Sequence, residues 1–396
     1  MQSTALPPLL SDLPADERTR LLDDETLRHL PAVFATVPDP RGRQGRRYPL
    51  PFLLTCLVAA LLCDCNSTAA IGQWCSERRA LLARHFPHQR AHTPTGALYR
   101  WLLPRLSVAE LEWALASWVR QTRPRRDREP LALDGKVVRG AVTLTQPAPH
   151  LLSVSTHHSQ ETLIQVRVSD KTNEIPVAQA LLPHLPVRGR VVTADALHTQ
   201  TATAQVIRDH HADYLLVVKD NQPRLQVELA AYFDDPQATA VQATTLDRRR
   251  GRTETRTLHV TTRLNAYLTR YFAFPCLRQV ARLIRTVQEK GRTRTETVYL
   301  ITSLTPRRAD PIRLLTLIRG HWRIESRHWV RDVTFGEDRS RLRGGQAPQI
   351  MAALRNLALT LIRRTGTTAI AAYRRHLAAH PAKALRLLGS NVRSRR

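Results

Sequence analysis

The sequence predicts an α/β protein in which a mixed sheet follows a helical block and an antiparallel β insertion interrupts the later part. Short apolar runs typical of strands begin at residue 131, and helical stretches lie between the later runs. Period-two alternation rich in Thr and Arg then appears between residues 240 and 303. Such alternation is typical of antiparallel strands with one buried and one solvent-facing side, and here the exposed side is basic.

The first 125 residues are interpreted as a polar lead-in, residues 1–30, and a helical domain, residues 31–125. The apolar run "LPFLLTCLVAALLC", residues 50–63, is too short to span a bilayer, so we expect a buried helix. Apolar residues at helical spacing in "SVAELEWALASWV" predict another helix. The charge-dense segment "RQTRPRRDREP" contains two prolines and marks the domain boundary.

Residues 126–239 are expected to form the first part of the α/β domain. The strand-like runs are "LALDG", "LLSVST", "TLIQVRV", "RVVTAD" and "DYLLVVK". Two helices are predicted between them, "NEIPVAQALLPHL" with Asn173 as N-cap, and "HTQTATAQVIRDHH". The nearly continuous apolar character of "YLLVV" predicts a central strand covered on both faces.

The later part divides into the β insertion, residues 240–305, and a return to long helices over residues 306–396, which end in the basic tail "NVRSRR". Both strand-like segments of the insertion, "GRTETRTLHVTT" and "GRTRTETVYLITS", begin at a Gly-Arg-Thr turn. We therefore expect an antiparallel β unit with one basic face.

The charge of the chain indicates a polyanionic partner. Its 396 residues include 60 basic and 33 acidic side chains, a formal net charge of +27. Such an excess attracts polyanions, so nucleic acid is the expected partner, with binding that weakens steeply with salt. Five cysteines, an odd number, and the absence of an evident cleavable signal predict free thiols in a reducing cytoplasm.

Two aspartates follow apolar strands directly. Asp134 ends the run in "LALDGKVVRG", where Gly135 permits a sharp turn, and Asp195 ends the run in "VVTADALHTQ". If the two strands are sheet neighbours, the carboxylates meet, and paired carboxylates bind a divalent metal or share a proton. The alternative for each aspartate alone is a helix N-cap or a turn residue.

The third candidate group lies in "RGHWRIESRHWVRDVTFGEDRSRLR". Treated as one helix, this segment places four ionisable side chains on a narrow stripe: His321, Glu325, His328 and Asp332. Trp322 and Trp329 lie seven residues apart on a flanking stripe and are expected to pack the helix against the sheet. The alternative is a solvated face with incidental histidines.

Two zinc sites are weaker alternatives. One would use Cys63, Cys65, Cys75 and His85, whose spacing matches no CxxC pattern. The other would use His321, Glu325 and His328, which lack an obvious further ligand.

The order Asp134, Asp195, Glu325, with a β insertion between the last two, resembles a DDE transposase of the broad IS4-like class, and more narrowly the ISAs1 family. The resemblance covers roughly residues 30 to 365 and rests on blocks that occur in that family's order: "DPRGRQGRRYPL", "LDGKVVRG", "KTNEIP", "VVTADALHTQ", "DYLLVVKDNQP" and "HWRIE…HWVRDVTFGED". It implies a ribonuclease-H-like core and, before it, the helical domain associated with these transposases.

The resemblance also implies the chemistry. Two Mg²⁺ ions, replaceable by Mn²⁺, would be held by Asp134, Asp195 and Glu325 and would support in-line attack on a phosphodiester. The implied enzyme cleaves the ends of an insertion sequence and joins them to target DNA. Its implied partners are the terminal repeats, target DNA and a second copy in a homodimeric DNA complex, in the nucleoid-associated cytoplasm of a bacterium, without a membrane.

The chain departs from the family pattern near the glutamate. Ile318, His321 and Asp332 stand where the IS4-like signature has Tyr, Arg and Lys. The segment "ESRHW" is one residue shorter than the ISAs1 pattern, and a one-residue deletion rotates the following helix by about 100°. This predicts a displacement of His328 and Asp332 relative to Glu325, and a catalytically decayed DNA-binding remnant is therefore the alternative function.

Further candidates for DNA contacts surround the carboxylates: Lys136, Arg139, Lys219, Asn221, His321, Arg323 and His328. Lysines suit phosphates as point charges, although Lys219 has a strand end as its alternative and Asn221 a turn. The arginines of the insertion and of residues 41–47 are expected phosphate contacts, which position DNA without reading its sequence. If Glu325 is not the third carboxylate, Asp332 or Glu337 is next. A nuclease acting on RNA or branched DNA is the third functional class.

Overall fold

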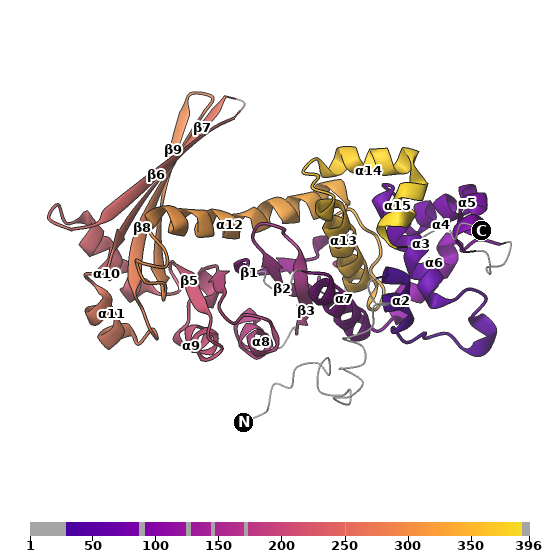
Figure 1. The fold of residues 1–396 in the computed structure, drawn as a ribbon, viewed down its shortest axis with the longest axis horizontal. Coiled ribbons are helices and arrows are strands. Elements are labelled where there is room, and N and C mark those ends of the chain that lie inside the picture. The colour runs from indigo at the N-terminus through magenta and orange to yellow at the C-terminus, as the bar shows by residue number, and fades with distance from the viewer. Residues whose placement is uncertain are drawn as a thin grey trace.

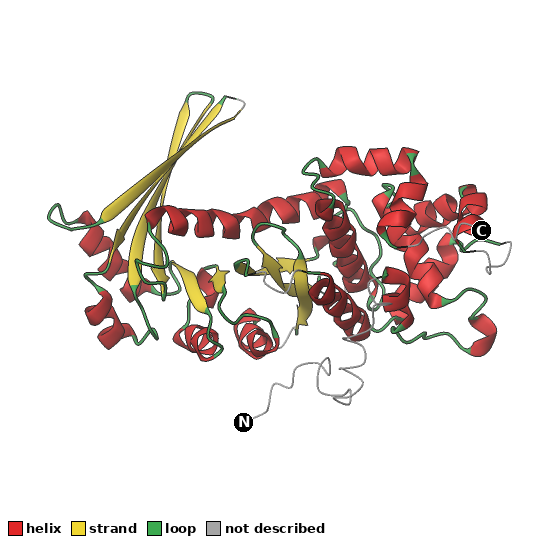
Figure 2. Cartoon of the chain, in the orientation of Figure 1, coloured by secondary structure: helices red, strands yellow, loops and turns green. Residues whose placement is uncertain are grey.

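The computed structural model describes residues 29–86, 92–123, 128–143, 147–169, 173–249 and 251–389. These residues form an elongated molecule, with long β hairpins at one end, a helix-covered sheet in the middle and a helical body at the other end (Figures 1 and 2). Residues 1–28 of the predicted lead-in and the basic tail, residues 391–396, lie outside the described residues.

The helical body begins with six α-helices: α2 (Leu30–Ala35), α3 (Leu50–Leu62), α4 (Thr68–Glu77), α5 (Arg79–His85), α6 (Gly96–Leu102) and α7 (Val108–Thr122). The α3 helix is apolar on all sides and buried along nearly its whole length, which confirms the predicted buried helix. The hydroxyl of Ser107 accepts a hydrogen bond from the backbone N–H of Glu110 and so caps α7. None of the helices in the described ranges is both long and apolar enough to cross a bilayer.

The described strands form one mixed sheet with the order β3-β2-β1-β4-β5-β9-β8-β7-β6. Its first five strands are β1 (Leu131–Val137), β2 (His150–Thr156), β3 (Thr162–Val168), β4 (Val191–Ala194) and β5 (Asp213–Val218). The pairs β1·β4 and β4·β5 are parallel, whereas β1·β2 and β2·β3 are antiparallel. This is the ribonuclease-H-like arrangement that the resemblance implied.

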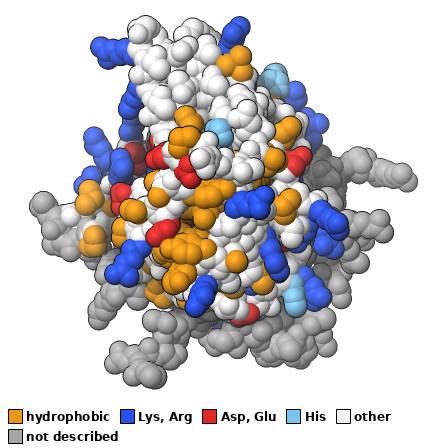
Figure 3. Space-filling view, turned by 90° about the vertical axis from the view of Figure 1, so that its left-hand side faces the viewer, with side chains coloured by type: hydrophobic (Ala, Val, Ile, Leu, Met, Phe, Trp, Pro, Cys, Tyr) orange, Lys and Arg blue, Asp and Glu red, His pale blue; other side chains and the backbone are white. Residues whose placement is uncertain are grey.

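The predicted β insertion forms antiparallel hairpins that lengthen this same sheet. The strands are β6 (Val241–Arg249), β7 (Arg252–Thr261), β8 (Gln279–Glu289) and β9 (Arg292–Thr302). Because β9 pairs with β5, the insertion continues the sheet of β1 to β5 and is not a separate layer. Helix α11 (Asn265–Phe272) interrupts it, which the period-two pattern did not predict. Viewed from this end, Lys and Arg side chains surround a group of hydrophobic ones (Figure 3).

Helices cover both faces of the sheet. One face meets α8 (Glu174–Leu181), α9 (Thr201–Asp209) and α10 (Pro223–Asp234), and the other meets the long α12 (Pro311–Trp329). Strand β5 is buried throughout: Leu215 and Val217 join the core under α12, while Tyr214, Leu216 and Val218 join the core on the other face. The prediction of a central, doubly covered strand is therefore confirmed.

The C-terminal helices connect the sheet to the helical body. Helix α12 passes into a π-helical turn, Val330–Thr334, and is followed by α13 (Ala347–Arg364), α14 (Ile370–Ala379) and α15 (Pro381–Leu387). Helix α12 packs on the sheet, and α13, α14 and α15 also pack against α3 of the helical body. The buried guanidinium of Arg374 makes this junction, because it donates to the carbonyl of Leu61 and to Asn66 of the N-terminal part.

Candidate active site

Asp134 and Asp195 lie side by side because their strands are parallel neighbours. The ladder between β1 and β4 pairs Leu133 with Ala194, and the two aspartates are the next positions along. Leu133 and Ala194 belong to the core opposite α12, so alternation turns both aspartates toward α12. The two strand ends therefore deliver a pair of carboxylates to one point, as the sequence predicted for neighbouring strands.

The environment of this pair disfavours two negative charges. Burial raises the pKa of Asp134 to about 7, and repulsion by Asp195, Glu174 and Glu325 adds to the effect. Burial also raises the pKa of Asp195, although the nearby His198 opposes this shift. The Oδ1 atom of Asp195 is buried and has no hydrogen-bond partner among the described residues. Such a carboxylate pair favours a proton or a cation between its members.

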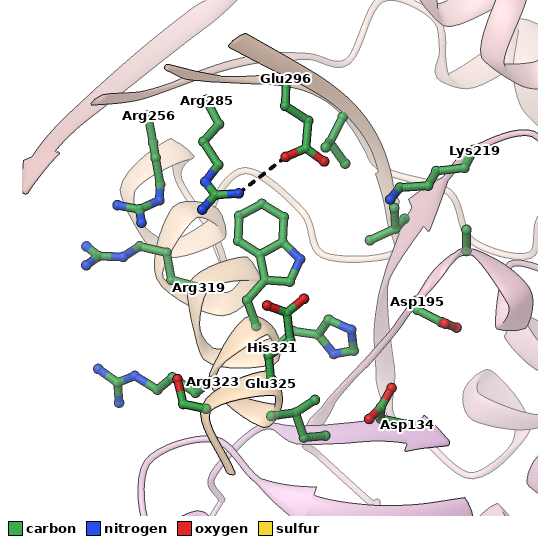
Figure 4. A pocket seen from close by; sticks show the side chains of 16 residues that line it. Asp134, Asp195, Lys219, Arg256, Arg285, Glu296, Arg319, His321, Arg323 and Glu325 are labelled. Atoms are coloured by element: carbon green, nitrogen blue, oxygen red, sulfur yellow. Dashed lines mark hydrogen bonds and ion pairs between the residues drawn. The ribbon is translucent and has the colours of Figure 1, made fainter. Parts of the chain in front are cut away.

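Glu325 faces this pair from α12. Asp134, Asp195 and Glu325 all line a cavity of about 600 Å³ that is bounded by α12 and by the hairpins β7–β9 (Figure 4). Glu325 is exposed, whereas the neighbouring Ile324 is buried in the sheet-facing side of the helix. The structure thus brings the three predicted carboxylates to one cavity.

Glu174 is a fourth carboxylate that sequence reasoning missed. It begins α8, next to the N-cap Asn173, whose side chain accepts from Ile175 as predicted. Its carboxylate lies 2.6 Å from Nε2 of His150 and 3.1 Å from Nε2 of His198. A Cβ at Gly135 would stand 2.0 Å from Glu174 Oε1, so the glycine after Asp134 makes room for this side chain. The sequence signal at this position was the block "KTNEIP", which predicted the start of a helix but no role for Glu174 at the site.

The histidines of the stripe are buried between α12 and the sheet. His321 hydrogen-bonds Thr193, and Nε2 of His328 lies 3.3 Å from Oδ2 of Asp134. Burial lowers the pKa of His321 to about 4 and that of His328 to about 2. The solvated-face alternative does not fit His321, which is buried, or His328, which is half-buried against Asp134.

The tryptophan prediction was half right. Trp322 packs against the core under α12, whereas the side chain of Trp329 is 61% exposed.

Asp332 and Glu337 are the alternative candidates for the third carboxylate. Both form ion pairs with Lys or Arg side chains. Nζ of Lys136 lies 2.6 Å from Asp332, and the fully buried Glu337 lies 2.8 Å from Arg331 and 3.4 Å from Arg355. These cations hold the pKa of Glu337 low against its burial. Neither residue lines the cavity of Figure 4, so Glu325 remains the preferred third carboxylate.

The residues that follow the shortened segment "ESRHW" contact β1, but neither His328 nor Asp332 lines the cavity that Glu325 lines. His328 contacts Asp134, and Asp332 contacts Lys136 two residues further along the same strand. Asp332 reaches that lysine from the π-helical turn rather than from a straight helix.

The remaining cationic and polar candidates divide into cavity-lining and structural groups. Lys219 and Arg323 line the cavity and form no ion pair with described residues. Lys136 is mostly buried in its ion pair, and Arg139 is exposed in a turn after β1, away from the cavity lining. Nδ2 of Asn221 donates to the carbonyl of Ala196 at 2.5 Å, which ties the loop after β5 to the turn after Asp195.

Three arginines that were not singled out individually complete the cavity wall. Arg256 and Arg285 come from β7 and β8, and Arg319 comes from α12. Each is held by carboxylates: Arg319 and Arg256 by Asp247, and Arg285 by Glu296, the ion pair drawn in Figure 4. The wall therefore holds guanidinium groups in fixed positions opposite the aspartates, and Asp247, Glu254 and Glu296 balance their charge.

The carboxylates fit a hard divalent cation in their chemistry. All three are oxygen donors, Asp195 has an unpartnered buried oxygen, and like charges raise the pKa of Asp134. Within the described chain, however, no three His, Cys, Asp or Glu side chains converge as a ready metal cluster, so neither zinc site is formed. All five cysteines are free.

Comparison with known proteins agrees with these features. Residues 126–361 match the family model described as a transposase DDE domain, and residues 32–119 match the model described as DDE_Tnp_1-associated. The chain is 27% identical over 345 residues to "Putative transposase YncI" of Escherichia coli O157:H7, covering 85% of this chain and 88% of that protein. It is 28% identical over 349 residues to "H repeat-associated putative transposase YhhI" of Escherichia coli K12, covering 85% and 90%.

Among solved structures, the cryo-EM structure of the piggyBac transposase synaptic complex with hairpin DNA is similar at a TM-score of 0.40 and 11% identity. The similarity covers 92% of this chain and 79% of that one.

Proposed function

The chain belongs to the transposase DDE domain family, and we propose that it is the transposase of an insertion sequence, which cuts DNA at the ends of its element and joins those ends to target DNA. Within the family we place it in the ISAs1 group, on the order of its sequence blocks. One observation supports the catalytic part above all. Two half-buried aspartates at the ends of parallel strands face Glu325 across a cavity with an arginine-lined wall.

In this proposal Asp134, Asp195 and Glu325 hold two Mg²⁺ ions, for which Mn²⁺ substitutes. When bound, the ions activate the attacking hydroxyl and stabilise the leaving oxygen of the phosphodiester. The protein's own residues do the rest: Arg256, Arg285 and the other wall cations neutralise phosphate charge. Lys219 and Arg323 are the wall cations without an intramolecular partner in the described chain, so they are available to DNA.

The contacts of the last turn of α12 support an active enzyme over a decayed remnant. His328 and Asp332, the residues that a rotation would displace, both contact β1. The matched N-terminal domain supports recognition of specific element ends, which a general nuclease for RNA or branched DNA does not need. We further propose that a homodimer assembles on the DNA, in the bacterial cytoplasm.

Strand cleavage of DNA that carries the element's own terminal repeats tests the proposal. Wild-type protein is expected to cleave in Mg²⁺ and not in Ca²⁺, while Asp195→Asn and Glu325→Gln still bind the DNA without cleaving it. Asp234→Asn is the matched control, because that carboxylate is exposed and, among the described residues, forms an ion pair with Arg282 alone. Cleavage that persists in Glu325→Gln would remove this residue from the site, and binding without cleavage by wild type would favour the decayed remnant.

A further inference from the structure

A buried threonine hydroxyl joins two histidines beneath the candidate active site. Oγ1 of Thr193 lies 2.9 Å from Nε2 of His157 and 3.1 Å from Nδ1 of His321. The same hydroxyl donates to the carbonyl of Leu131 at 3.2 Å. All three side chains are buried, so water does not compete for these bonds.

The valence of the hydroxyl fixes the proton positions on both rings. A threonine hydroxyl has one proton and two lone pairs. Its proton goes to the carbonyl of Leu131, so both lone pairs accept, and each histidine must present an N–H to Thr193. His157 is then protonated on Nε2 and His321 on Nδ1, which leaves Nε2 of His321 as an unprotonated acceptor.

The free nitrogen of His321 belongs to the cavity of the candidate active site. His321 lines that cavity together with Asp134, Asp195 and Glu325, and no described residue bonds its Nε2 (Figure 4). Burial lowers the pKa of His321 to about 4 and that of His157 to about 3, so neither ring carries a charge near neutral pH. The ring therefore offers the cavity a neutral acceptor whose direction is fixed.

The packing around His157 also favours this arrangement. A Cβ at Gly320 would stand 2.2 Å from Nδ1 of His157, so only glycine at this position of α12 lets the ring lie between helix and sheet. The bridge thus uses side chains from β4, the end of β2 and α12.

We propose that Thr193 locks His321 in the Nδ1–H form so that its Nε2 accepts a hydrogen bond from the attacking hydroxyl, of water in cleavage and of the DNA 3′ end in strand transfer. His321 orients this hydroxyl by accepting its hydrogen bond. The ring does not take up the proton of the hydroxyl, because burial disfavours the imidazolium. Thr193 is a positioning residue that acts through His321. This inference rests on the proposed transposase function for the identity of the hydroxyl, but not for the proton positions.

The proton positions are tested directly on the free protein. Long-range ¹⁵N–¹H spectra of histidine-labelled protein are expected to show His321 as the Nδ1–H tautomer, assigned by the signals that disappear in His321→Gln. Thr193→Ser keeps the hydroxyl and should keep this tautomer, whereas Thr193→Val should lose it. A His321 that carries its proton on Nε2 in the wild type would overturn the proposal whether or not the protein is a transposase.

The hydroxyl contact is tested by binding and by rate. In Ca²⁺, an element end with a 3′-hydroxyl should bind wild type about fivefold more tightly than a 3′-deoxy end, the effect of one hydrogen bond. His321→Asn can still donate to Thr193 but has no acceptor at the Nε2 position, so its preference for the 3′-hydroxyl end should be about fivefold smaller than that of wild type. His321→Gln, whose amide reaches that position, should recover part of the difference.

Separate rates of strand transfer and of hydrolytic cleavage test the contact for the DNA 3′-hydroxyl and for water. With a pre-cleaved 3′-hydroxyl end, His321→Asn should lower kcat of strand transfer about 10²-fold with little change in KM, as expected for a misplaced nucleophile. Hydrolytic cleavage, measured separately, should fall similarly. If both rates in His321→Asn equal those of wild type, the proposed contact is excluded. If wild type has neither reaction, the proposed function fails, and equal binding of the two ends by wild type would then exclude the contact as well.

Discussion

Nε2 of His328 in the last turn of α12 lies 3.3 Å from Oδ2 of Asp134 at the end of β1. Burial lowers the pKa of this histidine to about 2 and raises that of Asp134 to about 7. A neutral ring therefore meets a carboxyl that is protonated in part of the molecules near neutral pH. A divalent cation at Asp134 would replace this proton and relieve the repulsion by Asp195 and Glu325.

Mg²⁺ is accordingly expected to stabilise the wild-type protein. A ligand that binds only the folded state adds about 2.7 kcal/mol at a concentration 100 times its Kd. Differential scanning fluorimetry with increasing MgCl₂ should show a rising Tm for wild type and for Asp234→Asn, but not for Asp134→Asn. Because the cation displaces a proton, its apparent affinity should increase from pH 6 to pH 8. An equal rise of Tm in Asp134→Asn would place the cation elsewhere.

Glu112 should make stability depend on pH in the opposite sense to an ordinary surface carboxylate. Burial in α7 raises its pKa to about 8, although it accepts a hydrogen bond from Nε2 of Gln165 at 2.9 Å. The folded protein therefore binds a proton that the unfolded chain releases above its ordinary pKa of 4.5. This contribution is fully present below about pH 4.5, falls as the pH rises, and is lost above about pH 8, by at most about 5 kcal/mol.

Glu112→Gln keeps the hydrogen bond and removes the titration. Chemical denaturation from pH 5 to pH 8.5 should show the stability of this variant, relative to wild type, increasing with pH. A constant difference across that range would mean that Glu112 is ionised in the folded protein.

Gly135→Ala should damage the site without touching a carboxylate directly. The new Cβ would lie 2.0 Å from Oε1 and 2.4 Å from Cδ of Glu174, so this carboxylate must leave its position beside His150 and His198. Overpacking of this kind costs about 1–3 kcal/mol. Gly42→Ala is the control, because nothing lies within 4 Å of a Cβ there and its change should stay within about 0.5 kcal/mol. Equal urea midpoints for the two variants would contradict the prediction.

Lys136 and Lys219, both predicted DNA contacts, should behave differently. Lys219→Gln should weaken binding to all DNA sequences and reduce the slope of log K against log salt by about 1, because Lys219 is exposed and lines the cavity. Lys136→Gln should leave the slope unchanged. It should instead lower the free energy of unfolding by about 1–3 kcal/mol, because Asp332 loses its partner at 2.6 Å. Identical salt slopes for the two variants would refute this division of roles.

Much of the site was predictable because strand ends and helix periodicity are local signals. Asp134 and Asp195 follow apolar runs, and the spacing from His321 to Glu325 and His328 defines one side of a helix. Their meeting required only that β1 and β4 be parallel neighbours, which the structure shows.

The parts that sequence reasoning missed depend on distant pairing. Glu174 begins α8, which covers the face of the sheet opposite α12. No local sequence pattern predicts that its side chain lies against Gly135. The ion pair of Lys136 with Asp332 joins residues far apart in sequence, so Lys136 was expected to face DNA. Likewise, hydrophobic alternation predicted the hairpins of the insertion, but only the pairing of β9 with β5 makes them part of the catalytic sheet.

The order in which the sheet is assembled has a consequence during synthesis. β1 leaves the ribosome roughly 190 residues before Glu325 of α12, a delay of about 10–40 s at ordinary elongation rates. Until β9 has emerged, β5 has an unpaired edge, and until α12 has emerged, the face that carries Asp134 and Asp195 is bare. A chain that ends between β9 and α12 would therefore carry the basic hairpins without Glu325, the third carboxylate of the proposed site. Truncated products of the gene would compete with the finished enzyme for the same DNA.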